Sequence, residues 1–175
     1  VSIWVMGGAI ELLASSAASV AMAPEGYASF LAEAGEGLGL KLIGSPPTFD
    51  ALPEADIEFQ PAQPDDIAYI QYTSGSTRFP RGVVIKQKAC MSNLAGIIRH
   101  GVKIGPGDRW FSWLPFYHDM GLVGLVLVPV ASQVSVDYLD TREFAMRPRQ
   151  WLNLMTQTRA TISFGPPFGY ELCTR

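Results

Sequence analysis

The sequence is poor in cysteine, in histidine and in excess charge of either sign. Its 175 residues include two cysteines, Cys90 and Cys173, and two histidines. Two cysteines are too few for a disulfide framework, and no metal-ligand spacing links them. A net charge of −3 provides no global positive field for nucleic acid. We therefore expect a reduced, cytoplasmic protein that does not bind nucleic acid.

Long hydrophobic runs are also missing. The longest apolar run, residues 121–131, is too short for a membrane span and contains Pro129. The first residues loosely resemble a signal peptide, but they lack a basic segment and include Glu11. We predict no membrane span, and we interpret a chain that begins on valine and runs straight into apolar sequence as a fragment.

What the sequence does contain is an alternation of strand and helix patterns in a chain that is 48% hydrophobic. We expect strands at 19–23, 41–44, 67–72, 82–85, 109–114, 134–139 and 160–164. We expect helices at 9–20, 26–35, 88–99, 121–128 and 146–157, and one that starts near 168. Residues 45–66 are rich in proline and acidic side chains, which predicts a surface connection. This order predicts an α/β fold, with a mainly parallel sheet flanked by helices.

A hydroxyl-rich stretch, TSGSTRFPRGV (73–83), separates two of these strands. Gly75 permits a tight backbone path, and successive free N–H groups can hold phosphate oxygens. Arg78 and Arg81 would add positive charge. An ordinary Ser/Thr-rich turn is the alternative. The spacing fits neither a Walker A loop nor a nucleophile elbow, and GEGLG at 35–39 lacks the spacing and position of a dinucleotide fingerprint.

Two motifs together carry a resemblance to a known family. TSGSTRFPRGV closely resembles the phosphate loop of adenylate-forming enzymes, and WLPFYHDMGLVG (113–124) is similar to the carboxylate-side motif of fatty acyl-AMP ligases. FAMRPRQWLNLM (144–155) and FGPPFGYELCTR (164–175) agree more weakly. The resemblance covers about residues 11–175. The sequence departs from the superfamily where Arg78 replaces a usual glycine and Arg81 a usual lysine.

The resemblance implies a reaction and its cofactors. A fatty acid would be activated by ATP, with Mg²⁺, to an acyl-adenylate and pyrophosphate. The acyl group would then pass to the thiol of an acyl carrier protein, often on a polyketide or nonribosomal peptide synthase. The chain would be part of the large N-terminal adenylating domain, and the adenine-binding motif and C-terminal domain would be absent from it. The 175 residues alone are then expected to bind nucleotide weakly and not to turn over.

The resemblance also implies roles for individual residues. The phosphate-binding residues would be Thr73, Ser74, Gly75, Ser76, Thr77, Arg78 and Arg81. Thr77 would also reach Mg²⁺, directly or through water. The role of Arg81 is in question, because a planar guanidinium does not replace an ammonium everywhere.

His118 matches the family's histidine beside the carboxylate and the α-phosphate. An imidazole N–H there would orient both groups and stabilise charge in the transition state. Asp119 either holds that imidazole or caps the helix that follows. Met120 and Gly121 would bind the acyl substrate, whereas Leu125–Val128 fit plain core packing at least as well.

Two other functions remain open. One is an acyl-CoA ligase of the same superfamily, against which Arg78 and the HDMGL segment argue. The other is a truncated, non-catalytic relative that binds a lipid or a partner.

Overall fold

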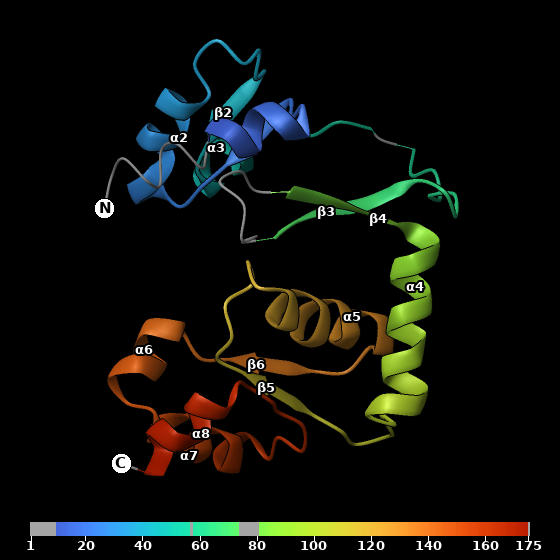
Figure 1. Cartoon of the computed structure of the whole chain (residues 1–175), viewed down its shortest axis with the longest axis vertical. Coiled ribbons are helices and arrows are strands. Elements are labelled where there is room, and N and C mark those ends of the chain that lie inside the picture. Colours follow the sequence, from blue (N-terminus) through green and yellow to red (C-terminus); the bar gives the residue numbers. More distant parts are fainter. Residues whose placement is uncertain (1–9, 57, 74–80, 175) are drawn as a thin grey trace. The chain divides into compact units, whose positions relative to one another are not determined.

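The structure, a computed structural model, describes residues 10–56, 58–73 and 81–174 (Figure 1). The chain divides into two units, Val1–Gln87 and Lys88–Arg175. These are the N-terminal unit and the C-terminal unit.

The N-terminal unit combines a parallel strand pair with an antiparallel hairpin. Its elements are a helical segment at 10–16, β1 (Val20–Met22), η1 (Glu25–Tyr27), α2 (Ala28–Ala34), β2 (Leu42–Gly44), α3 (Pro46–Asp50), β3 (Ile67–Thr73) and β4 (Arg81–Lys86). β1 pairs in parallel with β2, and β3 pairs antiparallel with β4. Residues 45–56 and 58–66 are largely exposed, and this stretch begins with α3 because Ser45 and Thr48 form a capping box.

The C-terminal unit is a layered arrangement of two parallel strands and helices. Its elements are α4 (Gln87–Gly96), η2 (Ile97–Gly101), β5 (Trp110–Ser112), η3 (Met120–Leu127), α5 (Val128–Ser132), β6 (Val136–Tyr138), α6 (Thr141–Met146), α7 (Arg149–Thr158) and α8 (Pro167–Thr174). β5 pairs with β6, and Ser112 lies opposite Tyr138. In Figure 1, β5 and β6 lie between α5 on one side and α7 with α8 on the other.

Aromatic side chains fill the core of this unit. Trp110, Phe111, Phe144 and Trp151 are buried. Trp113 stacks on Phe144 with ring centroids 3.7 Å apart, and both rings meet Trp151 edge-on. Trp151 comes from the apolar face that the sequence predicts for α7, and its Nε1 donates to Ser163 Oγ at 3.0 Å.

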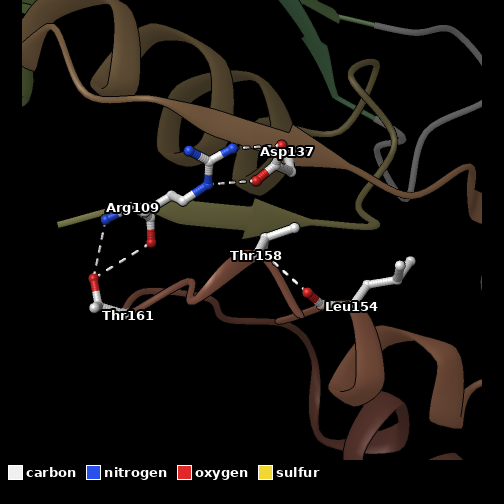
Figure 2. Close-up of polar contacts among 5 residues, drawn as sticks. All are labelled: Arg109, Asp137, Leu154, Thr158 and Thr161. Carbon is white, nitrogen blue, oxygen red and sulfur yellow. Dashed lines mark hydrogen bonds and ion pairs between the residues drawn. The ribbon is translucent and has the colours of Figure 1, made fainter. Parts of the chain in front are cut away.

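Polar contacts hold the amino end of β5 (Figure 2). Arg109 Nε and Nη2 contact the carboxylate oxygens of Asp137 at 2.7 and 2.9 Å, which raises the pKa of Arg109. Thr161 Oγ1 accepts the Arg109 N–H at 3.1 Å and donates to Asp108 Oδ1 at 2.8 Å. The Gly105 N–H also donates to the Asp108 carboxylate. This hydrogen bond and the one from the Thr161 hydroxyl lower the pKa of Asp108. These groups satisfy one another, so we assign this edge a structural role.

The structure confirms the mixed α/β fold with parallel strands and corrects several boundaries. The strand expected at 160–164 is only a parallel bridge from Ile162 to Trp110. The helix expected at 146–157 is Arg149–Thr158, and α6 before it was not predicted. α6 forms because the Asp140 carboxylate accepts the N–H groups of Arg142 and Glu143.

Candidate active site

The chain leaves the carboxyl end of β5 on a firmly held path. Buried Ser112 accepts the Leu114 N–H at its hydroxyl, at 3.0 Å, and its carbonyl accepts the Leu139 N–H at 2.8 Å. The Thr141 hydroxyl donates to the Trp113 carbonyl at 2.9 Å. Since ligands of open α/β sheets bind outside the carboxyl ends of the strands, this edge is where a functional site is expected.

A tight turn then brings the chain to His118. The His118 N–H donates to the Pro115 carbonyl at 3.3 Å, and the His118 carbonyl accepts the Leu122 N–H at 2.8 Å. Gly121 makes this turn possible, because a Cβ there would lie 2.2 Å from the Pro115 carbonyl oxygen. The residue is buried against the backbone of the turn, so its missing side chain fixes how closely η3 approaches residue 115. A role in acyl binding stays a prediction for this residue.

His118 and Asp119 form an exposed pair at the start of η3. His118 Nδ1 lies 2.8 Å from Asp119 Oδ1, and the two side chains are 61% and 69% exposed. The same carboxylate oxygen accepts the Met120 N–H at 2.6 Å, whereas that N–H lies 3.3 Å from Nδ1. We place the proton on Nδ1, because the carboxylate is the closer partner of the Met120 N–H. Nε2 is then the nitrogen available to a ligand.

Both hypotheses for Asp119 are therefore compatible with the geometry, since one carboxylate contacts the imidazole and caps η3. Met120 is partly exposed beside the pair, at 38%. By contrast, Leu125, Val128 and Trp113 are buried in the core, where they pack rather than meet solvent. The predicted buried helix at 121–128 is confirmed as the π-helical η3, which continues into α5.

The phosphate side of the predicted site belongs to the N-terminal unit. Thr73 ends β3 and lies opposite Arg81 at the start of β4, so the hairpin brings the two ends of the motif together. Ser74, Gly75, Ser76, Thr77 and Arg78 lie outside the described residues. A common cleft for the hairpin and His118 stays a prediction, since the two lie in separate units.

The described residues contain neither a metal-binding cluster nor a membrane-spanning helix. Within 10–56, 58–73 and 81–174, no group of three or more His, Cys, Asp or Glu side chains could hold a metal ion. No helix in the described part of the chain has the length and apolar character of a membrane crossing. Mg²⁺ needs no such group, because it is commonly held by one or two side chains, substrate phosphates and water.

Sequence reasoning missed two residues at the carboxyl edge of β5 and β6. Thr141 holds the backbone of Trp113, and the Tyr138 hydroxyl donates to the Leu125 carbonyl. Nothing local in the sequence indicates either contact, because each joins residues that only the fold brings together.

Several known proteins are similar to this chain in sequence and fold. Residues 13–175 match the profile of the AMP-binding enzyme family. A Caulobacter vibrioides protein with the provisional name acyl-CoA synthetase is 42% identical over 94% of this chain. The medium-chain-fatty-acid–[acyl-carrier-protein] ligase TtuA of Teredinibacter turnerae is 43% identical over 65% of the chain.

A solved structure from a study of fatty acyl-adenylate ligases of E. coli and L. pneumophila is also similar. It superposes with a TM-score of 0.89 at 50% identity over 99% of this chain. The chain spans only 28% of the Caulobacter relative, 18% of TtuA and 32% of the solved chain. With the profile matching almost its whole length, the chain belongs to the AMP-binding enzyme family.

Proposed function

We propose that this chain is part of an enzyme that activates a fatty acid with ATP and passes the acyl group to a carrier-protein thiol. The observation that carries the proposal is the His118–Asp119 pair, held at the carboxyl edge of a parallel strand pair in a chain of the AMP-binding family. We retain the expected cytoplasmic location as part of the proposal.

In the first step, a carboxylate oxygen of the fatty acid attacks the α-phosphorus of ATP. A new P–O bond forms, the bond to pyrophosphate breaks, and acyl-adenylate results. The protein contributes mainly charge neutralisation and positioning to such a transfer. His118 suits this task because Asp119 contacts Nδ1 and the side chain is largely exposed, so that Nε2 of the protonated ring would donate to substrate oxygens.

In the second step, the carrier's thiol sulfur attacks the acyl carbonyl carbon. A thioester forms, AMP leaves with the electron pair of the broken C–O bond, and the thiol proton is released. The name of TtuA favours a carrier protein as acceptor, whereas the name of the Caulobacter relative favours coenzyme A. Offering both acceptors to the full natural protein and weighing the products by mass spectrometry decides between them.

The residues around the hairpin would bind the phosphates of ATP. Thr73 and Arg81 lie opposite each other at its end, and Ser74, Gly75, Ser76, Thr77 and Arg78 complete the motif in the sequence. We expect Arg81→Gln to raise the KM for ATP and Arg81→Lys, which restores the family's usual residue, to leave it little changed. An equal rise in both variants would contradict phosphate binding by the cation at this position.

Mg²⁺, when bound, would supply positive charge that neutralises the phosphates of ATP. Thr77 is the predicted protein contact, and hydroxyl and phosphate oxygens suit a hard cation. We expect EDTA to abolish adenylate formation and Mg²⁺ to restore it. Thr77→Val should raise the Mg²⁺ concentration needed for half-maximal activity, and an unchanged requirement would remove Thr77 from the metal site.

Pyrophosphate exchange tests the activation step directly. In the full natural protein that carries this sequence, fatty-acid-dependent exchange between ATP and labelled pyrophosphate should fall by roughly 10²–10³-fold in His118→Ala, the range for the loss of one oxyanion donor. His100 is the matched control, because it is the chain's other histidine and lies exposed in η2. Equal exchange in His118→Ala and His100→Ala would refute the assignment.

A further inference from the structure

Tyr138 at the end of β6 contacts two parts of the candidate site at once. Its hydroxyl donates to the carbonyl of Leu125, the sixth residue of η3. Its ring meets Phe116 edge-on, with centroids 4.9 Å apart and an interplanar angle of 81°. Phe116 precedes His118 by two residues in the same turn.

The hydroxyl contact ties β6 to the later part of η3. This segment is π-helical, so its carbonyls bond to N–H groups five residues on, and it ends shortly before Pro129, which has no N–H. Leu125 is fully buried, so the Tyr138 hydroxyl donates to its carbonyl away from water.

The aromatic contact acts on the turn rather than on the helix. Phe116 is 53% exposed, so few other side chains hold it in place. Edge-on aromatic pairs at this separation are favourable beyond the area that they bury. Tyr138 is therefore a principal neighbour of the aromatic side chain that leads into His118.

The sheet places Tyr138 correctly for both contacts. It lies opposite Ser112, the last residue of β5, where the chain departs toward the turn. Because parallel strands end at the same edge, the tyrosine stands beside the beginning of the segment that carries His118. Partial burial raises the pKa of Tyr138 above its ordinary value, so its hydroxyl remains a donor through the neutral range.

We propose that Tyr138 is a positioning residue for His118, linking η3 to the turn through its hydroxyl and its ring. The inference rests on the proposed role of His118 in adenylate formation. The hydroxyl holds η3 at its sixth residue, Leu125, and the ring holds Phe116, so the imidazole lies on a segment that Tyr138 contacts on both sides of His118. Loss of Tyr138 misplaces the imidazole without removing any group that contacts the nucleotide.

Three variants and one control separate these contributions in the full natural protein. Tyr138→Phe removes the hydroxyl alone, Tyr138→Leu removes both contacts, and Phe116→Leu removes the ring contact alone. Tyr170→Phe is the control, because Tyr170 is a similarly exposed tyrosine whose ring packs on Trp151.

The kinetic readout is the separation of kcat from KM in pyrophosphate exchange. We expect kcat to fall about 3–10-fold in Tyr138→Phe, the worth of one ordinary hydrogen bond. In Tyr138→Leu we expect roughly 10–100-fold, since small displacements of a catalytic group are costly. The KM for ATP should stay within about twofold, because the variants leave nucleotide contacts intact. Tyr170→Phe should match the unmodified protein.

The positional readout is the imidazole signal of His118 in protein labelled with ¹³C at histidine. His118→Ala assigns the signal by its loss. We expect the signal to shift or broaden in Tyr138→Leu and Phe116→Leu and to stay unchanged in Tyr170→Phe. Tyr138→Phe keeps the test decisive if Tyr138→Leu fails to fold.

The outcomes distinguish this inference from the proposed function. No fatty-acid-dependent exchange in the unmodified protein would overturn the proposed function, and full exchange in His118→Ala would overturn the catalytic role of His118 and with it this inference. A strong loss in His118→Ala, together with unchanged kcat and an unchanged signal in Tyr138→Phe and Tyr138→Leu, would overturn the positioning role alone. A rise in the KM for ATP with unchanged kcat would overturn it as well.

Discussion

The hairpin of the N-terminal unit and the turn of the C-terminal unit carry the two halves of one predicted site, and they are built differently. β4 is exposed at five of its six positions, and Val83 and Val84 are 45% and 51% exposed. The turn around His118 follows buried β5 and is held by Ser112, Thr141 and Gly121. One half depends on strand pairing, whereas the other depends on a packed core.

The distribution of buried side chains explains the difference. Among the described residues, the buried apolar side chains of the N-terminal unit are Ala21 and Ala34, whereas all the large ones lie in the C-terminal unit. Burial of large apolar groups supplies most of the free energy of folding. A histidine that must meet a transition state needs a preorganised support. The support for His118 therefore comes from its own unit.

Trp151→Ala is expected to have the largest effect among the variants that test this contrast. The side chain is 1% exposed and contacts Trp113, Phe144 and Tyr170. We expect the free energy of unfolding of the C-terminal unit to fall by about 3–5 kcal/mol. Chemical denaturation followed by tryptophan fluorescence measures this change, since tryptophans 110 and 113 of the same core remain.

Leu152→Ala is the matched control on the same helix, because Leu152 is 44% exposed. We expect it to change the free energy of unfolding by less than about 1 kcal/mol. Similar losses in Trp151→Ala and Leu152→Ala would contradict a core centred on the aromatic cluster.

Gly121→Ala should have the next largest effect and should act on the turn. Its Cβ would lie 2.2 Å from a backbone oxygen that cannot move aside alone, and such overpacking costs about 1–3 kcal/mol. Gly96→Ala is the control, because a Cβ there meets nothing within 4 Å and α4 should gain about 0.5–1 kcal/mol. Thermal unfolding of both variants checks the prediction, which equal midpoints would contradict.

Acid should weaken the amino edge of β5, which has its own polar support. Hydrogen bonds from Gly105 and Thr161 lower the pKa of Asp108 in the folded chain below the ordinary 3.8. A lowered pKa contributes stability above the unfolded value, and this contribution disappears as the pH falls through the folded value. We therefore expect Asp108→Asn to flatten the loss of stability below about pH 4, measured by urea unfolding across pH. A parallel curve for the variant would contradict this role.

The sequence predicted local elements well because periodicity and caps are local. The strands near 20, 43, 70 and 84 and the helix over η3 agree with the structure. α6 was missed although Asp140 and Glu143 have the spacing of a helix start. The strand at 160–164 was predicted too long, because β-forming residues reveal nothing about whether a partner strand lies alongside.

The candidate site could be predicted only in part. His118 and Asp119 were found through a motif, and their contact was one of two stated hypotheses. Tyr138 was not found, because its importance depends on Leu125 in η3 and on Phe116 in the turn. Such a link becomes visible only when the fold brings the residues together.

The smallest effect is expected at the ion pair of the hairpin. Its measurement tests whether the hairpin is exposed to water, in contrast to the core below the turn around His118. Lys86 Nζ lies 2.9 Å from Asp65 Oδ1, and these side chains are 54% and 85% exposed. Exposed pairs contribute about 0.2–1 kcal/mol, and salt screens them. We therefore expect a double-mutant cycle with Lys86→Met and Asp65→Asn to give a coupling of at most about 0.5 kcal/mol, which weakens further in salt. A coupling well above 1 kcal/mol that salt does not reduce would show that the pair is shielded from water in solution. Another surface would then cover the hairpin, and the two halves of the site would be more alike than their side-chain burial indicates.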